Sequence, residues 1–224
     1  MRLPIFQRAT LCSLIAPLLL AGCAAPVKTD YSALRAAKPA SILVLPPVNE
    51  SPDVNATFSM LAQATYPLAE GGYYVMPVTL VNETFHQNGL TVAADMHEVP
   101  VAKLKEIFGA DAALYMKVTR YGSTYAVLNS AAVVTAEARL VDLSSGTLLW
   151  SGRATASNDE GGNNSGGGLA GLLVAAIVKQ IMNNVTDASH GVAAITSGRL
   201  LSAGTPNGLL YGPRSPMYGK DNAN

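Results

Sequence analysis

Cysteine is scarce in this chain, and a surplus of charge of either sign is missing. The 224 residues include only 2 cysteines, and 15 Lys and Arg balance 15 Asp and Glu. A chain this close to neutrality has no basic field to attract nucleic acid or anionic lipid. Since Cys12 and Cys23 both lie near the N-terminus, we expect no disulfide and no thiolate ligand in the folded part.

Motifs for nucleotide binding and nucleophilic catalysis are missing as well. No G-x-S-x-G sequence occurs, so a lipase-like serine nucleophile has no local support. Gly166, Gly168 and Gly171 do match G-x-G-x-x-G. A dinucleotide site also needs a strand that leads directly into the glycines, and the preceding strand is expected to end near Ala156. No Lys follows as in a Walker loop, so we expect a hinge there and predict no bound cofactor.

The three histidines do not form a metal-binding pattern. His86, His97 and His190 lack a second His or Cys at the spacing that metal ligands require. Asp95 and Glu98 stand beside His97, where a solvated charge cluster is the simpler interpretation. The sequence thus predicts no metal site and no catalytic residue, and we expect the protein not to be an enzyme.

The start of the chain is typical of a secretory signal. Two arginines give a positive start, and the apolar run over 9–21 is too short to span a bilayer. The sequence LAGC at 20–23 then resembles the lipobox of bacterial lipoproteins. In that family the chain is cut before the cysteine, here between Gly22 and Cys23. The cysteine then carries acyl chains such as palmitate.

Lipidation of Cys23 would make a membrane the first partner of the chain. One acyl chain binds a membrane only marginally, whereas three chains on one residue hold a protein permanently. In many Gram-negative lipoproteins an Asp after the cysteine retains the protein at the inner membrane, and Ala24 stands here instead. We therefore expect a lipid-anchored protein of the outer membrane that faces the periplasm. Cleavage would leave 202 residues with 13 basic and 15 acidic side chains, a net charge of −2.

The pattern along the chain predicts a mixed α/β domain. Apolar runs at 41–48 and 73–78 predict buried strands, and helical periodicity predicts helices over 55–70, 79–87 and 100–108. Thr79 is expected to cap the second of these helices, and Gly109 to end the third. The predicted regions are a signal peptide (1–22), a lipidated tether (23–39) with a short helical turn at 32–37, the α/β domain (40–203) and a Gly/Pro-rich tail (204–224).

The apolar pattern then changes to a period of two. Alternating runs at 113–121, 133–141 and 147–155 predict an antiparallel three-strand meander with one face in water. Glu137 and Arg153 would form a surface salt bridge across two of its strands, and Trp150 is expected to be buried against a helix. Strands separated by helices, followed by a meander, give one mixed sheet whose parallel βαβ part comes first.

A long C-terminal helix is the most functional-looking feature that remains. A strong helix is expected over 169–185, and residues 166–178 are apolar on nearly every side, but this apolar stretch is too short for an ordinary membrane span. Helix is expected to continue through 193–201. Either the apolar helix is enclosed within the domain, or one face meets a partner or a second copy in a homo-oligomer. Ala175 and Val178 lie off its main stripe and mark the candidate oligomer face.

Several blocks of the sequence carry a resemblance to a known family. The blocks AAKPASILVLPPVNESPDVNA, YYVMPVTLVNETFHQNGL, ADMHEVPVAKLKEIFGADAALYMKV and VDLSSGTLLWSG resemble bacterial lipoproteins known as candidate meningococcal surface antigens. The resemblance covers about Tyr31 to Tyr211. It implies a fold similar to the amino-terminal domain of the Tol propeller protein and to the core of the curli secretion-channel lipoprotein. It brings no catalytic residue, and only Cys23 transfers as a functional position.

These features favour a non-enzymatic lipoprotein that serves as an accessory or scaffold of a cell-envelope complex, with other envelope proteins as unidentified partners. The alternative is a subunit of an oligomeric secretion or export assembly. That alternative rests on likeness of fold, which alone is weak evidence of function. An envelope hydrolase comes third because no catalytic constellation supports it.

Overall fold

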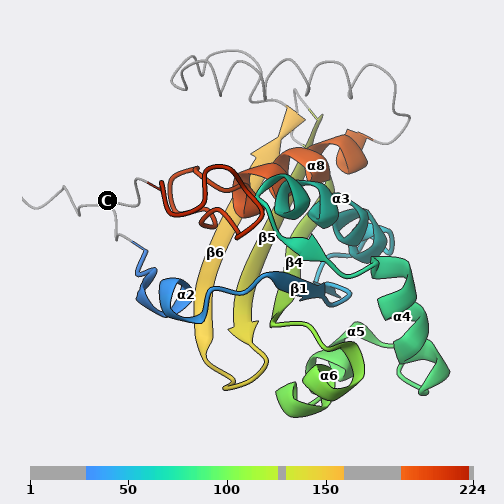
Figure 1. The fold of residues 1–224 in the computed structure, drawn as a ribbon. Helices are drawn as coiled ribbons and strands as arrows, with labels where there is room; N and C mark the ends of the chain where they lie inside the picture. The colour runs from blue at the N-terminus through green and yellow to red at the C-terminus, as the bar shows by residue number, and fades with distance from the viewer. Residues whose placement is uncertain (1–28, 126–129, 159–187, 222–224) are drawn as a thin grey trace, which may run out of the picture.

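A mixed β-sheet with helices on both faces forms the centre of the computed structural model, which describes residues 29–125, 130–158 and 188–221 (Figure 1). The strands are β1 (Ser41–Val44), β2 (Val48–Asn49), β3 (Tyr74–Val75), β4 (Ala112–Tyr125), β5 (Ser130–Asp142) and β6 (Leu148–Ser157). The helices are α2 (Ser32–Ala37), α3 (Ala56–Glu70), α4 (Val78–Gln87), α5 (Ala93–His97), α6 (Val101–Phe108) and α8 (Ala188–Leu201).

The order of the strands confirms the predicted fold class. The sheet runs β3-β1-β4-β5-β6, and β2 pairs with β4 beyond the end of β1. β1 is parallel to both β3 and β4, whereas β4, β5 and β6 are antiparallel neighbours. A parallel part with helical crossovers therefore comes first, and the predicted three-strand meander follows.

The apolar run at 41–48 forms two short strands rather than the one predicted. β1 ends at Val44, and β2 begins at Val48 and pairs with Lys117 of β4. Pro46 and Pro47 separate the two, because proline has no N–H to donate to a neighbouring strand. The strand predicted at 73–78 is likewise shorter, since α4 already begins at Val78.

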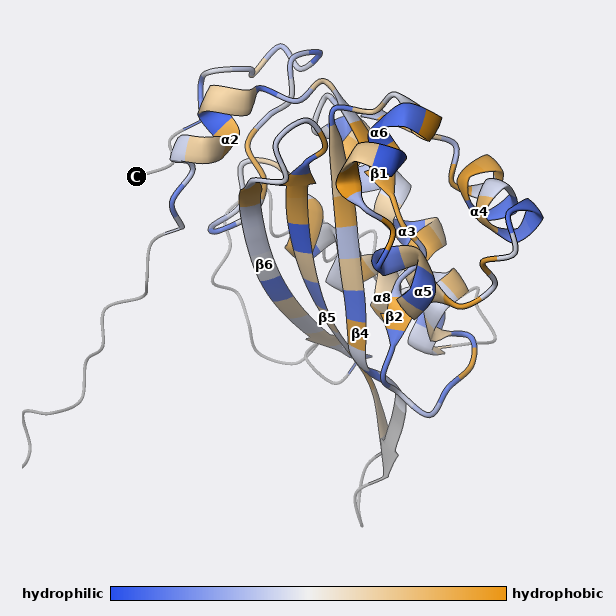
Figure 2. Cartoon of the chain, turned by 90° about the horizontal axis from the view of Figure 1, so that it is seen from below, coloured by the Kyte–Doolittle hydropathy of each residue, from blue (hydrophilic) through white to orange (hydrophobic). Residues whose placement is uncertain are grey.

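The sheet separates two hydrophobic cores of unequal size. The larger core lies under α3 and α8, and the smaller one lies under α4, α5 and α6 on the opposite face. The smaller core takes up Ala113 and Tyr115 from β4, so the prediction of one wet face is wrong for the first half of that strand. Further along, Lys117 and Arg139 are exposed, and hydrophilic and hydrophobic positions alternate along β5 (Figure 2).

Helix boundaries follow backbone geometry more than side-chain caps. Pro77 occupies the N-cap of α4 without a side-chain hydrogen bond, so the prediction that Thr79 caps this helix is wrong. Gly109 ends α6 as predicted, at φ +68° in the left-handed region that glycine adopts readily. Within α6, Leu104 is buried, whereas Ile107 is 45% exposed.

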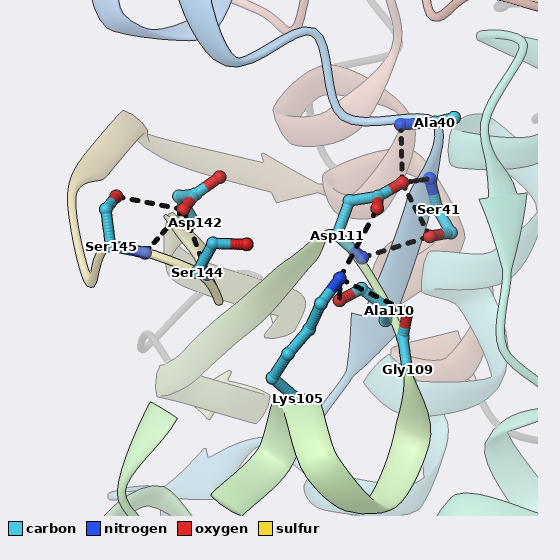
Figure 3. A network of polar contacts seen from close by, with 9 residues as sticks. All are labelled: Ala40, Ser41, Lys105, Gly109, Ala110, Asp111, Asp142, Ser144 and Ser145. Carbon is cyan, nitrogen blue, oxygen red and sulfur yellow. Dashed lines mark hydrogen bonds and ion pairs between the residues drawn. The ribbon is translucent and has the colours of Figure 1, made fainter. Parts of the chain in front are cut away.

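Asp111 holds the beginnings of β1 and β4 together (Figure 3). Its Oδ2 accepts hydrogen bonds from the backbone N–H groups of Ala40 and Ser41, both at 3.0 Å, and from the Ser41 hydroxyl at 2.8 Å. Lys105 lies 3.6 Å from its Oδ1. Burial opposes ionisation of this carboxyl, but the hydrogen bonds from Ser41 and Ala40 outweigh burial and lower its pKa.

The segment 204–221, which falls in the predicted Gly/Pro-rich tail, packs against the sheet domain. Leu209 and Leu210 are buried in the larger core. Gly212 donates its N–H to the carbonyl oxygen of Gly71 at 2.7 Å. A Cβ at Gly72 would lie 2.4 Å from the backbone nitrogen of Ser215, so the absence of a side chain permits this close approach.

Trp150 is buried, as predicted, between α8 and the C-terminal segment. Its indole Nε1 donates to the carbonyl oxygen of Asn207 at 3.1 Å, and only 2% of the residue is exposed. A Cβ at Gly152 would lie 2.4 Å from the Trp150 ring and 3.2 Å from Leu200 of α8. The ring therefore lies over the Gly152 backbone and contacts residues of β6, α8 and the C-terminal segment.

Candidate functional site

Several predicted functional positions lie outside the residues that the structure describes. These are Gly22, Cys23, the three glycines at 166, 168 and 171, and the candidate oligomer face at Ala175 and Val178. The predictions for them therefore stay predictions. Within the described ranges, no helix combines the length and apolar character needed to cross a membrane.

His86 and His97 differ in their exposure to solvent. His86 is exposed on α4. His97 turns inward, its Nε2 lies 2.9 Å from the carbonyl oxygen of Pro46, and its ring meets the Tyr115 ring edge-on at 5.2 Å. Burial lowers the pKa of His97, which favours the neutral ring. The predicted solvated cluster with Asp95 and Glu98 is wrong for His97, which packs as part of the fold.

His190 joins the beginnings of α3 and α8. Its Nδ1 lies 2.7 Å from the Ser59 hydroxyl, and its Nε2 lies 2.9 Å from the Gln63 side-chain nitrogen. His190 lies more than 120 positions from Ser59 and Gln63 in sequence, so spacing could not reveal the contact. A cleft of about 320 Å³ opens beside them, and its lining includes the exposed Phe58 and the buried Tyr121. We call it the α3–α8 cleft.

The direction of the hydrogen bond between His190 and Ser59 does not suit a serine nucleophile. With the Gln63 amide nitrogen donating to Nε2, the proton of the His190 ring sits on Nδ1 and is donated to Ser59. His190 then cannot accept the serine proton, as a general base must. Among the described residues, no carboxylate hydrogen-bonds to His190 to orient it, and no cluster of three metal-ligating side chains occurs. The cluster therefore acts as a polar joint between two helices.

A second hollow lies at the opposite end of the helix pair. It has a volume of about 370 Å³ and lies between α2 and the C-terminal segment. Leu34, Tyr73 and Leu210 provide its buried apolar and aromatic floor, while Arg35, Lys38 and Tyr218 line its exposed side. We call it the anchor-end groove, because the chain enters the domain here from the tether.

Hydrogen bonds between distant parts of the chain hold the anchor-end groove in shape. The Tyr31 hydroxyl donates to the carbonyl oxygen of Gly208 at 2.7 Å, and the Tyr73 hydroxyl donates to that of Leu210 at 2.8 Å. Burial is the main cause that raises the pKa of Tyr73, so this phenol stays protonated as a donor. Figure 1 shows α2 and the C-terminal segment beside β6 at the same side of the sheet.

The two hollows lie at opposite ends of α3 and α8. Ser59 and His190 meet near the N-terminal ends of the two helices, whereas a Cβ at Gly71 would lie 3.6 Å from Ala203, past both C-terminal ends. The helices therefore run side by side in the same direction. At 1.5 Å per residue, the stretch of α3 from Ser59 to Glu70 separates the ends by about 17 Å.

The open face of the meander carries paired charges. Arg153 lies 3.0 Å from Glu137 on the neighbouring strand, which confirms the predicted surface salt bridge. Lys117 lies 2.8 Å from Glu50 in the same way. Both pairs are exposed, and such pairs contribute about 0–1 kcal/mol. They do not form a catalytic site.

The fold and these surfaces define a mixed α/β domain with two small hollows and, in its described part, no catalytic constellation. The family model "Putative lipoprotein GNA1162-like" matches residues 29–214. The chain therefore belongs to the GNA1162-like lipoprotein family.

Two relatives support this assignment. The chain is 53% identical over 185 residues to "Putative lipoprotein NMB1124/NMB1162" of Neisseria meningitidis serogroup B, covering 83% of this chain and 85% of that protein. The crystal structure of lipoprotein GNA1162 from Neisseria meningitidis is 57% identical, with a TM-score of 0.53 over 65% of this chain and all of that one. The PelC dodecamer structure from Paraburkholderia phytofirmans is 15% identical, with a TM-score of 0.42 over 77% of this chain and 91% of that chain. A likeness this low carries no argument about function.

Proposed function

We propose that this chain is a lipid-anchored, non-enzymatic lipoprotein of the outer membrane, facing the periplasm, that serves as an accessory or scaffold of a cell-envelope complex. The observation that carries the proposal is the separation of two surfaces on one helix pair. The anchor-end groove lies where the tether enters the domain, and the α3–α8 cleft lies at the far end.

The tether supports a membrane-proximal place for the groove. Cys23 ends a lipobox-like sequence and lies only six residues before Thr29, the first described residue. Membership of a lipoprotein family agrees with acylation at Cys23. Ala24, in place of an aspartate, supports the outer membrane as the destination.

The far end offers an apolar contact for a protein partner. Val54 and Phe58 are 81% and 62% exposed, and Phe58 borders the α3–α8 cleft. An exposed aromatic beside a cleft is the kind of residue that anchors protein interfaces. A partner bound there would contact the end of the helix pair that lies away from the tether.

Site-specific crosslinking in living cells tests this assignment of the far end. A photo-reactive amino acid in place of Phe58 is expected to give one discrete adduct with an envelope protein. The matched control is the same amino acid in place of Ile107, which is 45% exposed on α6 beyond the other face of the sheet. Identical adduct patterns from both positions, or none from position 58, would contradict the proposal.

The alternative is a subunit of an oligomeric secretion or export assembly, which the apolar helix predicted at 169–185 favours. If one face of that helix joins subunits, Ala175→Asp with Val178→Asp should give a folded monomer from an oligomeric parent. If the helix is internal, two buried carboxylates should unfold the domain. Light scattering and circular dichroism on the mature chain carrying Cys23→Ser distinguish these outcomes, and a monomeric parent argues against the alternative.

A further inference from the structure

The anchor-end groove has a rim of basic and aromatic side chains that the proposed function does not use. We propose that this rim and groove bind the phosphate headgroups of anionic phospholipids, in the same membrane that holds the lipidated N-terminus. The inference rests on the proposed anchoring at Cys23 and adds a second, non-covalent contact with the bilayer.

The first argument is the length of the tether. Thr29 is six positions after Cys23, and six extended residue steps span at most about 20 Å. Thr29 itself is fixed at the groove end, because its hydroxyl donates to the Asn207 side-chain oxygen at 3.0 Å. An acylated Cys23 would therefore keep Thr29, at the groove end, within about 20 Å of the headgroup layer.

The second argument is charge. The segments 29–40 and 204–221, which form the groove end, contain four cations, Arg35, Lys38, Arg214 and Lys220, against two carboxylates. The mature chain as a whole carries a net charge of −2, so the expectation that it cannot attract anionic lipid holds for the total but not for this end. Attraction to an anionic membrane depends on the charges closest to the surface, because the potential falls off within a Debye length.

The four cations of the groove end differ from most cations of the open sheet face. Among the described residues, none of the four forms an ion pair, whereas on the sheet Lys117 and Arg153 are paired with Glu50 and Glu137. The exposed Arg139 of the sheet lies over the buried Tyr115 ring at 5.9 Å. The two carboxylates of the groove end accept backbone N–H groups instead. Asp30 accepts from Ser32 at 2.8 Å, and Asp221 accepts from Tyr211 at 3.0 Å.

Exposed aromatic and apolar side chains accompany the cations. Tyr74, Met217 and Tyr218 are each a little over 40% exposed, and the Arg214 guanidinium lies over the Tyr74 ring at 5.1 Å. Tyrosines and basic side chains together are typical of surfaces that sit at the membrane interface, where apolar rings meet acyl chains and charges meet headgroups. The open sheet face lacks this combination at its described exposed positions.

The shape of the groove suits one headgroup. Its volume of about 370 Å³ is in the range of small-molecule sites. Arg35, Lys38 and Asp221 line the same hollow. One Asp221 oxygen already accepts the Tyr211 N–H at 3.0 Å, and a phosphate between the two cations would accept charge-assisted hydrogen bonds from both. Lys38 is held at φ +47° in the left-handed region, where its N–H donates to the carbonyl oxygen of Leu34 at 3.0 Å and ends α2. Lys38 therefore lies at a fixed turn beside the groove.

Vesicle flotation with the mature chain carrying Cys23→Ser tests the inference without the lipid anchor. We expect binding to vesicles of phosphatidylcholine with phosphatidylglycerol, loss of binding as salt rises, and no binding to phosphatidylcholine alone. Each basic side chain near an anionic surface changes partitioning by about five-fold. Arg35→Gln with Lys38→Gln should therefore lower binding by about 25-fold at low salt.

The matched control is Lys103→Gln with Arg153→Gln, which removes the same charge from exposed positions away from the groove. It should leave binding within about two-fold of the parent. Equal loss in both variants, or equal binding to neutral vesicles, overturns the inference. Displacement by inorganic phosphate at constant ionic strength also overturns it, because the site would then recognise free phosphate. Labelling with palmitate reports acylation separately, so failure here and failure of the proposed anchoring are distinguishable.

Discussion

The two ends of the α3–α8 helix pair are built in different ways. The anchor end joins parts of the chain that are far apart in sequence, through Tyr31, Tyr73 and Trp150, each donating to a backbone carbonyl of the C-terminal segment. At the far end, the Ser59–His190–Gln63 cluster joins the two helices and Phe58 is exposed. Buried contacts are thus concentrated where the tether enters, and exposed apolar surface lies where a partner could approach.

The largest expected effect is at the anchor end. Trp150→Ala removes a ring that is 2% exposed and its hydrogen bond to Asn207, and truncation of a buried aromatic costs about 3–5 kcal/mol. Denaturant unfolding should show a lower free energy of unfolding. Proteolysis should also cleave the C-terminal segment sooner. A midpoint within error of the parent would contradict the view that this end is the better packed one.

Asp111, which joins the beginnings of β1 and β4, provides a pH-dependent test. Because its folded-state pKa is lowered, the stability it contributes is present above the ordinary carboxyl pKa and is lost as pH falls through the lower folded value. Asp111→Ala should reduce the free energy of unfolding by about 1–2 kcal/mol near neutral pH, allowing for its partial exposure. The difference from the parent should shrink below about pH 4, and a difference that stays constant with pH would contradict the ionised arrangement.

A smaller effect is expected in the polar joint at the far end. Ser59→Ala removes one partner of His190 and should lower the free energy of unfolding by about 1 kcal/mol. Thermal unfolding followed by circular dichroism measures it. A loss as large as that of Trp150→Ala would remove the contrast between the two ends.

The smallest effect is expected from Phe58→Ser. This ring is 62% exposed, and substitutions at exposed positions usually change stability by less than about 0.5 kcal/mol. The same variant should lose the adduct that crosslinking through the neighbouring exposed Val54 is expected to give. If unfolding shows a large loss of stability instead, Phe58 belongs to the core and not to a partner surface.

Local sequence patterns predicted the helices and strands well, but predicted less well which side chains are buried. The helices at 55–70 and 100–108, the meander, the Glu137–Arg153 pair and the buried Trp150 follow from periodicity and register. The second core did not, because burial of Ala113 and Tyr115 depends on which face the crossover helices cover. Alternation within one strand contains no such information.

The α3–α8 cleft and the anchor-end groove could not be predicted from local sequence patterns for a similar reason. Ser59 and His190 are brought together by two helices from distant parts of the chain. The segment 204–221 has no regular period, and its Gly, Pro and Tyr content resembles a tail until its Gly212 and Ser215 are seen against Gly71 and Gly72. The groove's positive charge was hidden by a whole-chain balance of 15 basic against 15 acidic residues.

The central claim, that the anchor end is tied to a membrane through Cys23, is tested most directly by metabolic labelling with palmitate followed by membrane fractionation. Cys23→Ser should abolish the label and leave either an uncut precursor or an unanchored form, because the thiol is the site of lipid attachment in the lipobox. The parent should be labelled and remain with the membrane in high salt, which weakens electrostatic contacts but not acyl chains. Equal incorporation of label into the parent and the variant would contradict the account.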